Sequence, residues 1–192
     1  MWERELSSWV FRVEPIEDES FSHVLGRFRR ANVLSYGTLS ELINISRADS
    51  KEEPLCGRAE VENWERPSSR AHPSEHTLDE LCRVMRIEKE TLSDRLIYPS
   101  KESVGIGQWH LQTRLCSACY AQVPIHRMRW QRTDLAVCEE HGCKLLSACP
   151  SCGVGFRLPS LWAEGCCDRC WLSFAHMGQW AKRGVSITES PM

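Results

Sequence analysis

The chain has 192 residues, of which 42% are hydrophobic and 26% are charged, and its net charge is -2. This length suits one ordinary domain, or a small core joined to a metal-bound module. No run of 18 apolar residues is present and the N-terminus lacks an apolar signal region, so we expect no membrane span, no secretion and a cytoplasmic location. The 11 cysteines are then expected to bind metal rather than to form disulfides.

The first predicted elements are a short extended segment at residues 9–13, ended by Pro15, and a helix from Asp18 or Ser20 to Asn32. Apolar residues at helical spacing predict a face that packs in a core, made of Phe21, Val24, Leu25, Phe28 and Ala31. Another face is a basic stripe made of His23, Arg27 and Arg30. Such a stripe is either solvated surface or a docking surface, and both interpretations stay open.

A second short helix is predicted after Ser35, with Leu39, Leu42 and Ile43 on its apolar side. The segment Asn44–Glu62 is mostly polar or charged, so we expect a mobile insert that ends in a short helix around Trp64.

The clearest helical pair is predicted from Thr77 to Ile97, with Thr77 and Glu80 as a capping box at its start. Two short helices joined by a tight turn resemble a helix-turn-helix. A second helix that reads DNA normally offers basic or amide side chains, but residues 88–95 carry a net charge of -1. A structural or protein-binding role is therefore favoured over DNA readout.

The composition changes near Tyr98, Pro99 and Ser100, which we interpret as a linker. Residues 1–100 carry a net charge of -5 and residues 101–192 a net charge of +3, and nine of the 11 cysteines lie between Cys116 and Cys170. The sequence thus predicts a mainly α-helical domain at 1–100 with a helix-turn-helix-like pair. A zinc-ribbon or tandem zinc-finger module at 101–182 and a flexible tail at 183–192 should follow.

Four pairs of metal-ligand residues, each with two residues between its members, occur in the second half. A two-residue gap lets both side chains of a tight turn reach one tetrahedral ion. The simplest pairing gives one zinc site from Cys116, Cys119, Cys138 and His141, and a second from Cys149, Cys152, Cys167 and Cys170. With four protein ligands and no open position each, both sites should be structural rather than catalytic.

Interleaved pairing of the same ligands would instead give a cross-brace, as in a RING domain. Seven residues separate His141 from Cys149, which disfavours that arrangement and the ubiquitin-ligase function that goes with it. The pair Cys149 and Cys152 could also be a redox dithiol, but no βαβ pattern surrounds it. Cys166 could replace Cys167 as a ligand, although the spacing favours Cys167.

A basic and aromatic run at residues 126–132 is the one local candidate for RNA contact. In an extended chain, Arg127 and Arg129 would share one face, and Met128 and Trp130 the other. Arg beside an exposed Trp could stack on an RNA base, or the Trp could pack the small core of the module. Seven thiolates and two Zn²⁺ ions would lower the charge of the whole chain to -5, so duplex DNA should bind weakly.

Three sets of residues, in this order along the chain, resemble the TniQ family of transposon target-selection proteins. The first is Pro15 with Glu19, Ser20, Phe21 and Ser22, followed by residues 25–32. The second contains Arg114, Leu115, residues 116–120, His126, Arg127, Trp130, Gln131 and the zinc ligands. The third is residues 158–162 with Gly165, Cys166 and Cys167. In its short length the chain resembles the TniQ of CRISPR-associated transposons that use a single effector protein.

The resemblance implies a non-catalytic adaptor in the bacterial cytosol. It would link an RNA-guided CRISPR effector and its guide RNA to the end of a filament of the AAA+ ATPase TnsC, and touch target DNA only indirectly. No phosphate-binding loop of the P-loop type is present, which agrees with a protein that is not an enzyme. The alternative from the residues alone is a transcription regulator that binds DNA through the helix-turn-helix and a zinc ribbon.

Overall fold

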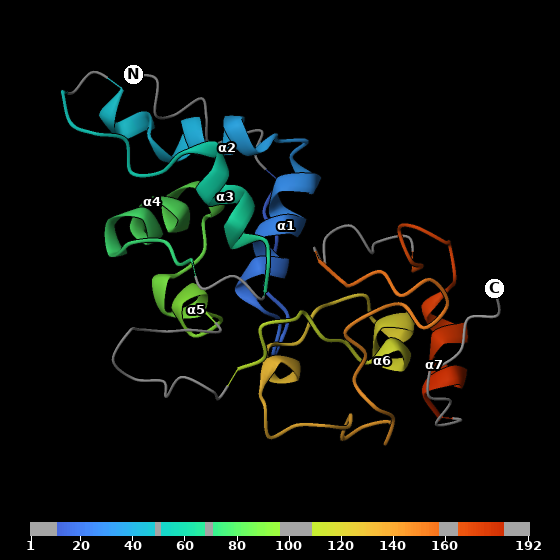
Figure 1. The fold of residues 1–192 in the computed structure, drawn as a ribbon. Coiled ribbons are helices and arrows are strands. Elements are labelled where there is room, and N and C mark those ends of the chain that lie inside the picture. Colours follow the sequence, from blue (N-terminus) through green and yellow to red (C-terminus); the bar gives the residue numbers. More distant parts are fainter. Residues whose placement is uncertain (1–10, 49–50, 68–70, 97–108, 158–164, 183–192) are drawn as a thin grey trace.

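The computed structural model describes residues 11–48, 51–67, 71–96, 109–157 and 165–182. The described part of the first half contains the helices α1 Phe21–Ala31, α2 Tyr36–Ile43, α3 Arg58–Trp64, α4 Glu75–Met85 and α5 Lys89–Ser93, with a 3-10 turn η1 at Ile45–Arg47 (Figure 1). The second half contains α6 Ser117–Gln122, the 3-10 helix η2 Met128–Gln131 and α7 Phe174–Lys182. Within the described ranges the extended segments form only isolated bridges, such as the one between Leu115 and Leu146.

Serine side chains begin three of the helices. The Oγ atoms of Ser20, Ser35 and Ser74 accept hydrogen bonds from backbone N–H groups three residues later, at 3.4, 3.0 and 3.2 Å. The first helix therefore has the bounds that its sequence predicted. The capping box at Thr77 was wrong, because Ser74 caps α4 three residues earlier and leaves Thr77 buried inside the helix.

One apolar cluster holds the first half together. It contains the predicted core residues of α1 other than Ala31, which is exposed, together with Leu39, Ile43, Leu81, Met85 and Leu92. The cluster also includes Cys56, Val61 and Trp64, so the expected mobile insert is anchored in the core at Cys56 and Val61, while most of its other described residues are exposed. Asn44 fixes its path, because the side-chain amide donates to the carbonyl of Cys56 at 2.8 Å.

The predicted pair of helices before residue 97 is present as α4 and α5, joined by Arg86 in a left-handed conformation with φ 57°. The second helix has only five residues, and its Leu92 is fully buried. A helix-turn-helix role for this pair stays a prediction. The predicted linker at 98–100 and the tail at 183–192 lie outside the described residues, as do residues 9–10 and 158–162.

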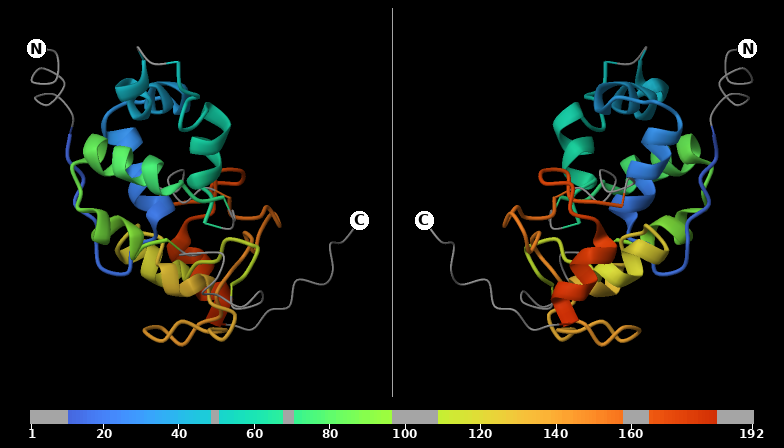
Figure 2. Two further views of the ribbon diagram at one scale, coloured as in Figure 1. Left: turned by 90° about the vertical axis from the view of Figure 1, so that its left-hand side faces the viewer. Right: turned by 90° about the vertical axis from the view of Figure 1, so that its right-hand side faces the viewer.

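A second apolar cluster forms the core of the cysteine-rich half. Tyr120 of α6 and Phe174 of α7 contact each other with ring centroids 5.0 Å apart, and Trp130 and Met177 are buried beside them. Helix α7 packs along α6 in both views of Figure 2. No helix among the described residues is long and apolar enough to cross a lipid bilayer.

Candidate metal centres and the junction beside them

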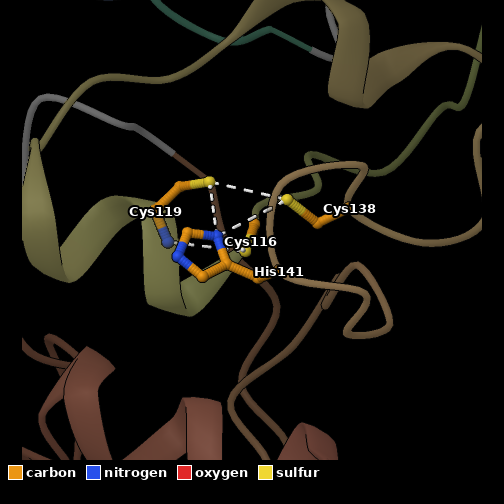
Figure 3. A group of neighbouring side chains, drawn as sticks. All are labelled: Cys116, Cys119, Cys138 and His141. Atoms are coloured by element: carbon orange, nitrogen blue, oxygen red, sulfur yellow. Dashed lines mark hydrogen bonds between the residues drawn. The ribbon is translucent and has the colours of Figure 1, made fainter.

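The first group of candidate ligands comes from α6 and from a tight turn that faces it (Figure 3). Cys116 caps α6 and Cys119 lies on its first turn, while Cys138 and His141 lie on the turn. The Sγ of Cys119 is 3.5 Å from the Sγ of Cys138 and 3.2 Å from Nδ1 of His141. All four ligand atoms lie within 4.8 Å of one another, as the ligands of one tetrahedral ion do.

Local hydrogen bonds hold the second ligand pair in this shape. The N–H of Gly142 donates to the carbonyl of Cys138 at 2.7 Å, and the N–H of Cys138 donates to the carbonyl of Cys143 at 2.8 Å. Gly142 has φ 61°, a conformation that a residue without Cβ adopts readily. The backbone therefore reverses direction here, and the side chains of Cys138 and His141 point to the same side.

The second group contains Cys149, Cys152, Cys167 and Cys170, whose sulfur atoms also lie within 4.8 Å of one another. Cys149 is 3.6 Å from Cys170, and Cys152 is 3.7 Å from Cys167, measured between Sγ atoms. Cys149 and Cys152 lie on one turn, closed by a hydrogen bond from the N–H of Gly153 to the carbonyl of Cys149. Cys167 and Cys170 lie on another, closed by a hydrogen bond from the N–H of Trp171 to the carbonyl of Cys167. The ligand pairs thus group in chain order, and the interleaved arrangement of a RING domain is absent from the two groups.

Both groups have the chemistry of a metal site. Thiolates and imidazole are the ligands that zinc prefers, and burial of the group excludes competing water. Burial raises the pKa of the thiols of Cys116, Cys119, Cys138 and Cys167 above the ordinary value, and raises the pKa of Cys149 to about 12. A bound cation would therefore have to displace protons from these thiols, which makes its binding weaker in acid.

Two residues that the sequence did not assign lie against the first group. The Sγ of Cys143 is 3.4 Å from the Sγ of Cys116, and Oε2 of Glu140 is 3.3 Å from the Sγ of Cys119. Their positions inside and just after the turn from Cys138 to His141 are the only sequence signal that could have pointed to them. Within the structure, Glu140 is also paired with Arg129 and, at 3.5 Å, with Arg127.

Arg127, Arg129 and Trp130 are arranged differently from the predicted RNA-binding run. Residues 128–131 form the 3-10 helix η2, so the alternation of an extended chain does not apply. Trp130 is 1% exposed, so a role in stacking on RNA is wrong and the alternative of core packing is correct. Arg129 pairs with Asp18 at 3.0 Å and with Glu140, and with Arg127 it can offset the negative charge beside the first group.

The predicted basic stripe on α1 is also corrected in part. His23 is 3% exposed, with Nδ1 2.6 Å from Oε1 of Glu19 and Nε2 3.3 Å from the hydroxyl of Tyr120. It therefore lies beneath the metal-ligand half and cannot contribute to an open docking surface. Arg27 pairs with Glu19 at 2.6 Å, and its side chain is 32% exposed. Only Arg30 of the three is fully on the surface.

These contacts belong to a polar junction between the two halves, which we define as Glu19, Ser20, His23, Arg27, Arg114, Tyr120, His126 and Gln131. The backbone N–H of Ser20 donates to the carbonyl of His126 at 2.9 Å, and Nδ1 of His126 lies 2.9 Å from the Oγ of Ser20. Nε2 of His126, on the other side of the ring, donates a hydrogen bond to the carbonyl of Arg114 at 3.1 Å. Residues 106 positions apart are thus joined through buried hydrogen bonds.

Burial sets the charge states in the junction. It lowers the pKa of His126 to about 3, so the imidazole is neutral in the folded chain near neutral pH. Burial alone would raise the pKa of Glu19, but hydrogen bonds from His23 and Arg27 outweigh it and hold the pKa below the ordinary value. Glu19 is therefore a buried carboxylate with two partners, and an arrangement of that kind is sensitive to loss of any member.

Comparison with protein-family models and with curated proteins gives no match for this chain.

Proposed function

We propose that the chain is a non-catalytic target-selection adaptor of the TniQ type in RNA-guided DNA transposition. It would link a CRISPR effector with its guide RNA to the AAA+ ATPase TnsC. The observation that carries the proposal is the junction. Ser20, from the first set of TniQ-like residues, is hydrogen-bonded to His126 from the second. Arg27 pairs with Glu19 beside Ser20, and Arg114 is hydrogen-bonded both to His126 and to Gln131. Residues that carry the resemblance thus form one interacting group.

Two zinc ions would complete this adaptor, one for each ligand group. Three thiols with an imidazole, and four thiols, are donor sets typical of structural zinc. An ion that is held by four protein ligands has no position for a substrate. Its contribution would be to hold α6, α7 and the turns around them in place, and through the junction to fix how the first half is presented to a partner.

The proposal is tested by affinity capture with the purified, zinc-loaded chain. TnsC with ATP, the effector protein, the guide RNA and the effector–guide complex are added separately and then together. We expect capture of TnsC, capture of the effector only with its guide RNA, and a joint complex of all components. A chain that captures none of them, alone or together, would overturn the adaptor function.

The same preparation separates the adaptor from a transcription regulator. The net charge of -1 over residues 88–95 and a zinc-corrected charge of -5 for the chain leave few phosphate contacts, so duplex DNA should bind weakly and without sequence preference. A sub-micromolar complex with one DNA sequence at physiological salt would favour the regulator and contradict the proposal.

A further inference from the structure

Cys143 lies beside the first ligand group without belonging to it. Its sulfur is 3.4 Å from the Sγ of Cys116, and the two side chains are 2% and 0% exposed. The hydrogen bond from the N–H of Cys138 to its carbonyl, with a bridge between Val137 and Lys144, fixes the backbone of Cys143 relative to the turn. The thiol is therefore positioned by the same structure that positions the ligands.

Metal binding would determine which of the two sulfur atoms donates the hydrogen bond. Between two free thiols either sulfur can donate. Once Cys116 has lost its proton to bind a cation, only the S–H of Cys143 remains as a donor, and the thiolate of Cys116 must accept. Cys116 also accepts from the backbone N–H of Cys119 at 3.4 Å, so the thiolate would be held from two sides.

We propose that Cys143 is a positioning residue of the first metal centre, whose S–H donates to the metal-bound thiolate of Cys116. The inference rests on the proposed zinc site at Cys116, Cys119, Cys138 and His141. Groups that hydrogen-bond to a metal ligand fix its orientation and tune its basicity, and their loss typically weakens metal binding about 10–100-fold. The side chain of Cys116 is 0% exposed, so bulk solvent does not reach its sulfur to take over this bond.

The test compares Cys143→Ser, which keeps a donor, with Cys143→Ala and Cys143→Val, which do not. Each zinc-loaded variant is mixed with an excess of a chromogenic chelator, and the release of each ion is timed. We expect Ala and Val to release one of two ions about 10–100-fold sooner than the unchanged chain, and Ser to restore most of the difference. Cys82→Ala, on α4 and outside both ligand groups, is the matched control and should leave both release phases unchanged.

Cobalt substitution gives a readout that loss of packing alone would not move. A hydrogen bond to a thiolate stabilises its lone pairs, so the thiolate-to-cobalt charge-transfer band should shift to longer wavelength in Ala and Val but not in Ser. Equal release rates and spectra for Ser and Val would overturn the proposal. Binding of only one ion by all three variants would make Cys143 a ligand instead, and binding of fewer than two by the unchanged chain would reject the underlying zinc site.

Discussion

The two halves of the molecule have cores of different composition. In the first half, one cluster of apolar side chains from α1 to α5 is continuous and contains none of the proposed metal ligands. In the second half, the buried cluster itself includes Cys116, Cys119, Cys138, Cys149 and Cys167. A core built from ligands depends on the ion that they hold, whereas a core built from leucine and phenylalanine does not. The two halves should therefore respond differently to removal of metal.

Removal of metal should give the largest contrast between them. A chelator should unfold residues 116–170, because structural zinc contributes about 10–16 kcal/mol of folding free energy in small zinc modules. The apolar cluster of the first half should stay protected, although the first turn of α1 should exchange faster once its bond to His126 is lost. Hydrogen exchange followed by mass spectrometry, with and without chelator, measures both effects.

Elemental analysis supplies the reference for that experiment. We expect two zinc ions per chain, and the same number in Cys56→Ser, since Cys56 lies in the apolar cluster of the first half. One ion or none in the unchanged chain would show that a ligand group is wrongly assigned. Loss of protection across α2, α3 and α4 after chelation would show that the first half also depends on metal.

A substitution in the junction should give the next largest effect on stability, because the junction holds the two halves against each other. Glu19→Gln removes the charge that pairs with Arg27 and leaves one acceptor oxygen where the carboxylate offers one to His23 and the other to Arg27. Breaking a buried pair by removing one partner typically costs about 3–5 kcal/mol. Denaturant unfolding of zinc-loaded protein measures the loss, and Glu17→Gln, on the exposed surface nearby, should cost less than about 0.5 kcal/mol. Equal midpoints for the two variants would contradict the role of Glu19.

Local patterns in the sequence predicted much of this arrangement. The core face of α1 follows from helical periodicity, and the eight ligands follow from the two-residue gaps, since both depend on neighbours along the chain. The ion pair of Arg27 with Glu19, which directly precedes the cap of α1, is likewise a contact between residues close in the sequence.

Contacts between distant segments could not be predicted in the same way. His23 has the position of a surface residue within α1, and only the approach of Tyr120 from the other half buries it. The polar composition of the insert likewise concealed that Cys56 and Val61 fill gaps beside α2. For α4, Thr77 was predicted as the cap, whereas the structure has Ser74 in that role, three residues earlier.

A change of pH should have a smaller effect on the free energy of unfolding, and part of that effect should come from His126 in the junction. His126 is neutral when folded, with a pKa of about 3 against an ordinary value of 6.5. Its contribution is fully present above pH 6.5 and is lost as the pH falls, because the unfolded chain binds the proton first. The loss should be about 1.4 kcal/mol per pH unit below 6.5.

The measurement compares the free energy of unfolding of the unchanged chain and of His126→Gln between pH 7.5 and 5.5. Proton competition at the ligands also weakens zinc binding in acid, but it affects both proteins alike, so the difference between their slopes isolates His126. We expect the unchanged chain to have the steeper decline. Parallel slopes would show that His126 does not carry this dependence.

The smallest effect on stability is expected at the far end of α1, where the helix leaves the junction. Arg30 is exposed and lies near the end of α1, so Arg30→Glu should change stability by less than about 0.5 kcal/mol. If this end of α1 faces TnsC, the substitution should weaken capture of the ATPase, most strongly at low salt, because exposed charges act mainly on association and register. Arg27→Glu is the matched contrast, since it breaks the pair with Glu19 and should lower stability as well. Normal capture of TnsC by a folded Arg30→Glu chain would show that the interface lies on another surface.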